Sequence, residues 1–333
     1  MPGSQAGGIL HHVWVSCHFH AAASKAIETS GLSKDYGEGR GVFDLDLEVR
    51  PGEVFGFLGP NGAGKSTMMK MLLGLISPSG GAARILGLDC AADGLAIKRR
   101  VGYLPGDFAM YPGLTGAEML DHLASLRGGT SQAVRDTLAD RFEAQLDRPI
   151  GDLSTGNRQK IGLISAFMHE PEVLILDEPI AGLDPLVQQS FHALLDETAA
   201  EGGTVLLSSH TLSEVERVAD RVAILRRGRL VRVDTLENLR EVAVHRLEVD
   251  IAGGREHAAD LAGVPGVTDV RHEGDHLLVS YEGSADPLVK ALARYEVSAL
   301  RSRDDDLEEV FLDLYRDRPP GPGGDGGEPG EWS

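Results

Sequence analysis

The chain has 333 residues, enough for one large domain and a second, smaller one, since single domains mostly contain about 100 to 200 residues. Its formal net charge of −19, without a long cluster of lysine and arginine, argues against a nucleic-acid partner, because a phosphate backbone would be repelled. Two cysteines cannot form a disulfide framework or a cysteine-based zinc site, and no apolar run approaches the ~18 residues of a membrane span. We therefore expect a protein of a reducing compartment that works at a membrane only through a partner.

Residues 1–24 have neither the apolar core nor the basic start of a secretion signal. The spacing of their four histidines and Cys17 matches no metal site. We expect a disordered N-terminal extension or an over-called translation start.

From residue 26 the pattern changes to short strands that alternate with helices. Continuous apolar runs such as Val173–Asp177 are typical of strands buried on both faces of a parallel sheet. Helical spacing covers Thr115–Glu170, and the run Arg221–Val233 is typical of a hairpin with its turn around Arg227. These patterns predict an α/β fold.

A second unit begins around His245, with strands and helices in the order β-α-β-β-α-β and one further helix. This order is compatible with a small α+β domain of the ferredoxin-like kind, which we place at residues 244–316. Residues 317–333 contain ten Gly or Pro in seventeen positions and cannot bury a core, so we expect a disordered tail.

The stretch GPNGAGKST fits the pattern GxxxxGK[ST] between an apolar strand and an apolar helix. Its glycines let backbone N–H groups point at a phosphate, and the helix N-terminus adds its positive end. We expect Lys65 to bridge the outer phosphates of a nucleotide and Ser66 to bind Mg²⁺. The candidate nucleotide-binding residues of this loop are Gly59, Pro60, Asn61, Gly62, Ala63, Gly64, Lys65, Ser66 and Thr67.

An acidic pair ends the buried run VLILDE far downstream. Asp177 can hold Mg²⁺ through water, and Glu178 beside it can polarise the water that attacks a γ-phosphate. Two adjacent carboxylates could instead cap a helix, but the phosphate loop in the same chain favours the catalytic interpretation.

Three further patterns follow in order: LSTGNRQK from Leu153, AGLDP from Ala181 and SSH from Ser208. With the two motifs above, they make residues 26–240 resemble the ATP-binding subunits of ABC transporters. The resemblance implies a P-loop NTPase fold, ATP and Mg²⁺ as cofactors, and ATP hydrolysis. It also implies an ABC ATPase domain at residues 25–243, whose helical subdomain covers about residues 107–170.

The same resemblance implies roles for single residues. Ser154 and the backbone near Gly156 would face the γ-phosphate held by the other protomer, and Asp184 would link the two sites across a dimer. His210 would contact the γ-phosphate, and Tyr36 would stack on adenine. Plainer alternatives are a helix N-cap for Ser154, an ordinary helix start for Asp184, and a buried core histidine for His210.

One chain carries one phosphate loop and one signature sequence, so a complete site requires two chains that face head to tail. The resemblance implies that this homodimer, or a pair with a second ATPase, drives membrane permease subunits from the cytoplasmic face of the membrane. The stretch DDDLEEVFLDLYRD resembles the last helix of bacterial drug-exporter ATPases of the daunorubicin-resistance type. One alternative is a soluble ABC ATPase of translation or DNA maintenance, which would need two cassettes or long coiled coils. A second is a non-catalytic regulator, which would lack a catalytic group.

The chain departs from the family after the strand that begins at Val101, where Gly106 and Asp107 replace the usual glutamine. In the family, that glutamine reaches Mg²⁺ or the attacking water while its loop touches the permease. The lysine, both carboxylates and the histidine are present, so we expect hydrolysis to persist. We expect the coupling between ATP and the permease to change, with Asp107 or a water in place of the glutamine.

Overall fold

The computed structural model describes residues 25–129, 131–241 and 244–303, in two units that meet in the sequence between Leu239 and Arg240. Each unit has its own hydrophobic core. The expected N-terminal extension, the last helix from Asp304 and the C-terminal tail lie outside the described residues.

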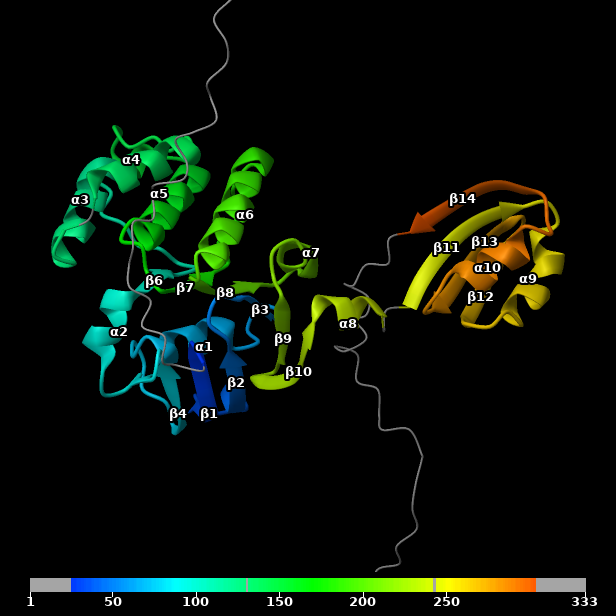
Figure 1. Ribbon diagram of the computed structural model, residues 1–333, viewed down its shortest axis with the longest axis horizontal. Coiled ribbons are helices and arrows are strands. Elements are labelled where there is room, and N and C mark those ends of the chain that lie inside the picture. The colour runs from blue at the N-terminus through cyan, green and yellow to red at the C-terminus, as the bar shows by residue number, and fades with distance from the viewer. Residues whose placement is uncertain (1–24, 130, 242–243, 304–333) are drawn as a thin grey trace, which may run out of the picture. The chain divides into compact units, whose positions relative to one another are not determined.

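A six-stranded sheet forms the centre of the first unit (Figure 1). Its spatial order is β10 (Arg229–Thr235), β9 (Arg221–Arg226), β3 (Val54–Leu58), β8 (Thr204–Ser209), β7 (Val173–Asp177) and β6 (Val101–Leu104). All neighbours are parallel except β9 and β10, which form the predicted hairpin. The strands β3, β7 and β8 are buried along their whole length, which is why β3 and β7 are mostly apolar without alternation.

A second, antiparallel sheet accompanies it, and the sequence pattern does not predict this sheet. Its order is β2 (Gly41–Val49), β1 (Ile27–Asp35), β4 (Gly80–Ile85) and β5 (Leu88–Asp89). Register shifts on both sides of Leu32 break the pairing of β1 with β2, so β1 lacks a clean two-residue period. Side chains of both sheets and of α1 (Lys65–Leu72), among them Phe55, Leu45 and Met68, share one core.

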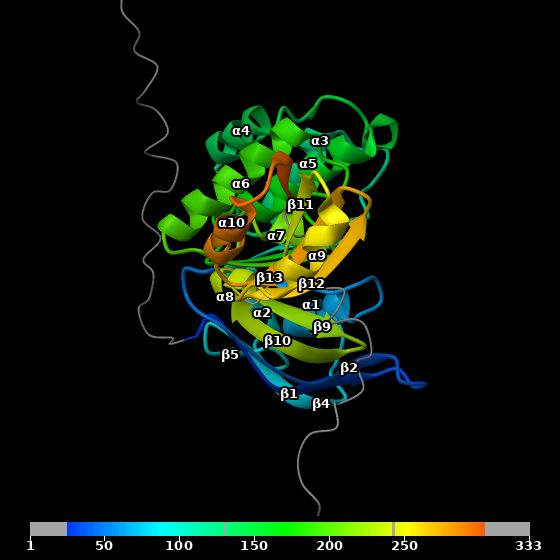
Figure 2. The same cartoon turned by 90° about the vertical axis from the view of Figure 1, so that its right-hand side faces the viewer.

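The other helices of this unit are α2 (Gly94–Arg100), α3 (Gly116–Leu126), α4 (Gln132–Arg141), the 3-10 turn η2 (Ile150–Asp152), α5 (Thr155–Phe167), α6 (Pro185–Ala200) and α7 (Leu212–Val215). The short helix α8 (Leu236–Glu241) contains the boundary between the two units. Figures 1 and 2 show α3, α4 and α5 gathered at one end of the unit, away from β1, β2 and β4. Arg141 on α4 pairs with both carboxylate oxygens of Glu197 on α6, at 2.5 and 2.9 Å, which ties this helical part to the core. Among the described helices, none combines the length and the apolar character needed to cross a bilayer.

The second unit contains β11 (Val244–Ile251), α9 (Gly254–Ala262), β12 (Val267–Glu273), β13 (His276–Glu282), α10 (Asp286–Leu292) and β14 (Val297–Arg303). Its sheet has the order β12-β13-β11-β14, and all neighbours are antiparallel. Alternate residues of the central strands, such as Val249 and Val279, pack against Leu261 of α9 and Leu288 of α10. This is the β-α-β-β-α-β order of a ferredoxin-like domain.

Candidate active site

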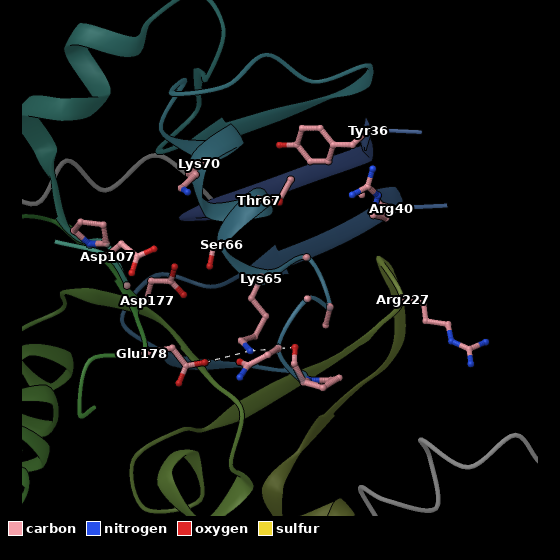
Figure 3. A pocket seen from close by; sticks show the side chains of 18 of the residues that line it. Tyr36, Arg40, Lys65, Ser66, Thr67, Lys70, Asp107, Asp177, Glu178 and Arg227 are labelled. Carbon is pink, nitrogen blue, oxygen red and sulfur yellow. Dashed lines mark hydrogen bonds and ion pairs between the residues drawn. The ribbon is translucent and has the colours of Figure 1, made fainter. Parts of the chain in front are cut away.

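A pocket of about 670 Å³ opens where β3, β6 and β7 end, the edge at which open α/β sheets bind ligands (Figure 3). Five segments line it: the loop between β1 and β2, the loop and first turns of α1, the loop after β6, the end of β7, and the β9–β10 turn. The lining residues are Tyr36, Gly39–Gly41, Pro60–Thr67, Lys70, Pro105–Asp107, Asp177, Glu178 and Arg227. The fold thus brings distant parts of the sequence to one cavity.

The stretch GPNGAGKST forms an anion-binding loop at the start of α1. Gly64 is the N-cap of α1 and has φ 109°, a left-handed conformation that only glycine adopts easily. A Cβ there would lie 2.8 Å from Cγ2 of Val42, so a larger residue would force its surroundings to shift. Since Gly64 has no side chain to cap α1, the first N–H groups of the helix stay available for an anion such as a phosphate.

Lys65 lies buried at the bottom of this loop, with 5% of its surface exposed. Its Nζ donates to the carbonyl of Gly59 at 2.5 Å and to that of Pro60 at 3.4 Å. The same Nζ lies 3.2 Å from Oε1 of Glu178. These contacts hold the ammonium group between the loop and the acidic pair.

Asp177 is 2% exposed at the end of β7. Its Oδ1 accepts a hydrogen bond from Oγ of Ser208 at 2.6 Å, and Ser208 Oγ accepts one from the amide of Glu178 at 3.1 Å. The hydrogen bond from Ser208 goes to Oδ1 alone, and Asp177 also lines the pocket. A carboxylate oxygen of Asp177 and the Ser66 hydroxyl in one pocket are the hard oxygen donors that suit Mg²⁺, so the residues fit this ion.

Glu178 has φ 51°, a left-handed conformation that costs a residue with a side chain about 1 to 3 kcal/mol. Its Oε2 lies 2.8 Å from Nδ1 of His210. Its Oε1 is buried and has no hydrogen-bond partner among the described residues, although the Lys65 ammonium is close. Half of the His210 side chain is exposed, so the alternative of a buried core histidine is wrong.

Ser154, Gly156 and Asp184 lie outside the pocket lining. Ser154 is the N-cap of α5 and accepts from the amide of Asn157 at 3.2 Å, as its plainer interpretation predicts. Asp184 is the N-cap of α6, where Oδ1 accepts from the amide of Val187 at 3.0 Å. This hydrogen bond, with Lys160 nearby, lowers the pKa of Asp184 and keeps it charged.

Most of the predicted site residues line the pocket: Tyr36, Pro60 to Thr67, Asp177 and Glu178. Two more contact a lining residue, since Gly59 accepts a hydrogen bond from Lys65 and His210 lies beside Glu178. Sequence reasoning missed the cationic side chains of Arg40, Lys70 and Arg227, which also line the pocket. Lys70 follows Ser66 by one helical turn, so the period of α1 could have placed it on the same side. Arg40 lies in the same loop as Tyr36, four residues further along the chain, whereas Arg227 carries no such local signal, because tertiary contacts bring it there.

The comparisons with known proteins agree with this geometry. A family model described as ABC transporter matches residues 42–181. The chain is 34% identical to "Bacitracin transport ATP-binding protein BcrA" of Enterococcus faecalis, over 86% of this chain and 96% of the relative. It is 34% identical to "Daunorubicin/doxorubicin resistance ATP-binding protein DrrA" of Streptomyces peucetius, over 87% of this chain and 92% of the relative.

Solved structures of similar proteins also match this fold. A structure described as an ATP binding subunit of an ABC transporter is 35% identical and has a TM-score of 0.59, over 65% of this chain and 92% of that one. A dimeric bacterial ABC transporter cassette is 24% identical and has a TM-score of 0.58, over 63% of this chain and 98% of that one. The second likeness bears on the fold alone.

Proposed function

The chain belongs to the family of ATP-binding subunits of ABC transporters, which hydrolyse ATP to power transport, and from this membership we propose how its site and its partners work. The predicted family and the predicted P-loop NTPase fold are confirmed. The relatives above carry transport and drug-resistance names, which favours an export subunit over a soluble ATPase of translation or DNA maintenance. The domain bounds remain our proposal: an ATPase domain at 25–243, with its helical subdomain at about 107–170, and an accessory domain at 244–316.

The proposed site rests on one observation: residues of the phosphate loop, including Ser66, and both carboxylates of the acidic pair Asp177 and Glu178 line the same pocket. The free amides of α1 and the Lys65 ammonium would bind the outer phosphates of ATP. Ser66 and Asp177 would hold Mg²⁺, which when bound neutralises phosphate charge. Glu178 would take a proton from the attacking water, and His210 would orient Glu178 and contact the γ-phosphate.

A complete site would require two copies of the chain. Ser154 and Gly156, at the N-terminus of α5, lie outside the pocket of their own chain. In a head-to-tail dimer this helix end would face the γ-phosphate bound by the partner, and Asp184 would connect the two sites. A homodimer fits, and so does a pair with a second ATPase. ATP would then stabilise the closed dimer, and hydrolysis would release it.

We place the subunit at the cytoplasmic face of the membrane, bound to a permease, and we propose a drug, antibiotic or lipid as the exported substrate. The relatives named for bacitracin transport and for daunorubicin and doxorubicin resistance support this substrate class. After cell fractionation, the chain expressed alone should remain in the supernatant, and co-expression with the cognate permease should move it to the membrane fraction. Equal membrane association with and without the permease would contradict this partner.

The loop after β6 supports a narrower proposal about coupling. Gly106 lies next to Asp177, because a Cβ at Gly106 would be 3.3 Å from Oδ2 of Asp177. The side chain of Asp107 also lines the pocket (Figure 3). No glutamine reaches the metal position from this loop, so Asp107 or a water would act there. The stretch DFAMYPGLTG would contact the permease.

Gly106→Gln should therefore change the stimulation of ATP hydrolysis by the permease about fivefold, the effect of one hydrogen bond of about 1 kcal/mol. The measurement is the ATPase rate with and without the permease in membranes. Gly94→Gln is the matched control, because a Cβ at Gly94 meets nothing within 4 Å and Gly94 lies outside the pocket. If Gly106→Gln alters neither the basal rate nor its stimulation, the coupling proposal fails.

A further inference from the structure

A cation already occupies one side of the Tyr36 ring. Nζ of Lys34 lies 5.5 Å from the ring centroid, within the range of a cation–π interaction. The same Nζ donates to the carbonyl of Ser77 at 2.8 Å, so the loop after α1 fixes its position. The ring remains 51% exposed and lines the pocket (Figure 3), which leaves ring surface for a ligand.

The backbone below the ring is fixed as well. The amide of Tyr36 donates to the carbonyl of Arg40 at 2.9 Å, and the amide of Arg40 donates to that of Gly37 at 3.0 Å. The amide of Asp35 donates to Oγ of Ser79 at 3.2 Å, and Oδ1 of Asp35 accepts from the amide of Gly37 at 2.7 Å. The backbone that carries the ring is thus held in place by its own chain, which lowers the entropy lost when a ligand stacks on the ring.

We propose that Lys34 is a positioning residue for the nucleotide base: it holds the Tyr36 ring so that the ring lies between the Lys34 ammonium and the base. The proposal rests on the stacking role of Tyr36 in the proposed function. Lys34 acts through the ring and does not touch the nucleotide. Its loss should therefore weaken the binding of a molecule that has a base and leave the binding of the phosphates alone unchanged.

Lys34→Met tests this inference, because it removes the ammonium group and keeps an unbranched side chain. The measurement is calorimetric binding of ADP and of inorganic tripolyphosphate to the full chain with Mg²⁺. We expect about two- to fivefold weaker binding of ADP, as an exposed cation–π pair predicts, and unchanged binding of tripolyphosphate. Lys34→Arg should retain the affinity for ADP, since a guanidinium also stacks on an aromatic ring.

Lys98→Met is the matched control, since Lys98 is exposed and outside the pocket. An equal loss for ADP and tripolyphosphate would show a general charge effect or a damaged fold, and would overturn the proposal. A double-mutant cycle gives a second test: in the Tyr36→Leu background, Lys34→Met should cause no further loss. Additive losses would overturn the role of Lys34 and leave that of Tyr36 intact. If Tyr36→Leu itself leaves ADP binding unchanged, the stacking role in the proposed function fails as well.

Discussion

Glu178→Gln should bind ATP about as tightly as the parent chain and hydrolyse it at least about a hundredfold more slowly, the contribution expected of a general base. Glutamine keeps the size of the side chain, so contacts of the phosphates with Lys65 and the α1 amides persist. The carboxamide cannot take a proton from water. Since hydrolysis would no longer open the dimer, ATP should trap it. Steady-state ATPase assays, ATP binding and size-exclusion chromatography with ATP measure the three effects.

A control for this substitution must share the unusual backbone of Glu178. Glu143 has the same φ of 51° and is exposed, outside the pocket, so Glu143→Gln makes the same chemical change in the same conformation. We expect it to hydrolyse ATP at the parental rate. Full turnover by Glu178→Gln would show that another group accepts the proton, and the assignment of the base would be wrong.

The sequence was most informative where local chemistry determines local structure. The glycines of the phosphate loop must adopt left-handed or crowded positions, and the run before Asp177 is a strand covered on both faces. The N-caps at Ser154 and Asp184 also follow from short-range hydrogen bonds. For these elements the residue types alone predict the geometry.

The rest depends on contacts between distant segments. Arg227 reaches the pocket because its hairpin is fixed to two other elements: the amide of Phe43 donates to Gly228 at 2.7 Å, and the amide of Gly228 donates to Ala63 at 2.9 Å. Lys34 lies on β1, two positions before Tyr36, and its ammonium group reaches the Tyr36 ring. The pairing of β1 with β2 shifts register just before Lys34, so the sequence does not show clearly which side chains of β1 share a face. The two-residue spacing of Lys34 and Tyr36 and the alternation within β2 are local signals, but they give neither the pairing partners of the second sheet nor the position of Arg227 in the pocket.

Lys65→Met should lower the affinity for ATP at least about a hundredfold. Each charge-assisted hydrogen bond contributes about 1.5 to 3 kcal/mol, and the loss of two amounts to a factor of about a hundred or more. The ammonium group is already oriented by the carbonyls of Gly59 and Pro60, so little entropy is lost when phosphates bind. Equilibrium binding of ATP measures the effect, and thermal unfolding without nucleotide checks that Glu178 tolerates the loss of its partner.

Lys70→Met separates geometry from charge. It removes the same charge from the same pocket, but Lys70 is exposed and lies about one and a half turns further along α1. If the effect of Lys65 on ATP affinity depends on its buried position, Lys70→Met should weaken ATP binding only a few-fold, since exposed charges are screened by water and salt. Equal losses for the two variants would mean that the pocket attracts phosphate by its total charge. The specific contacts of Lys65 with the phosphates would then be the wrong explanation.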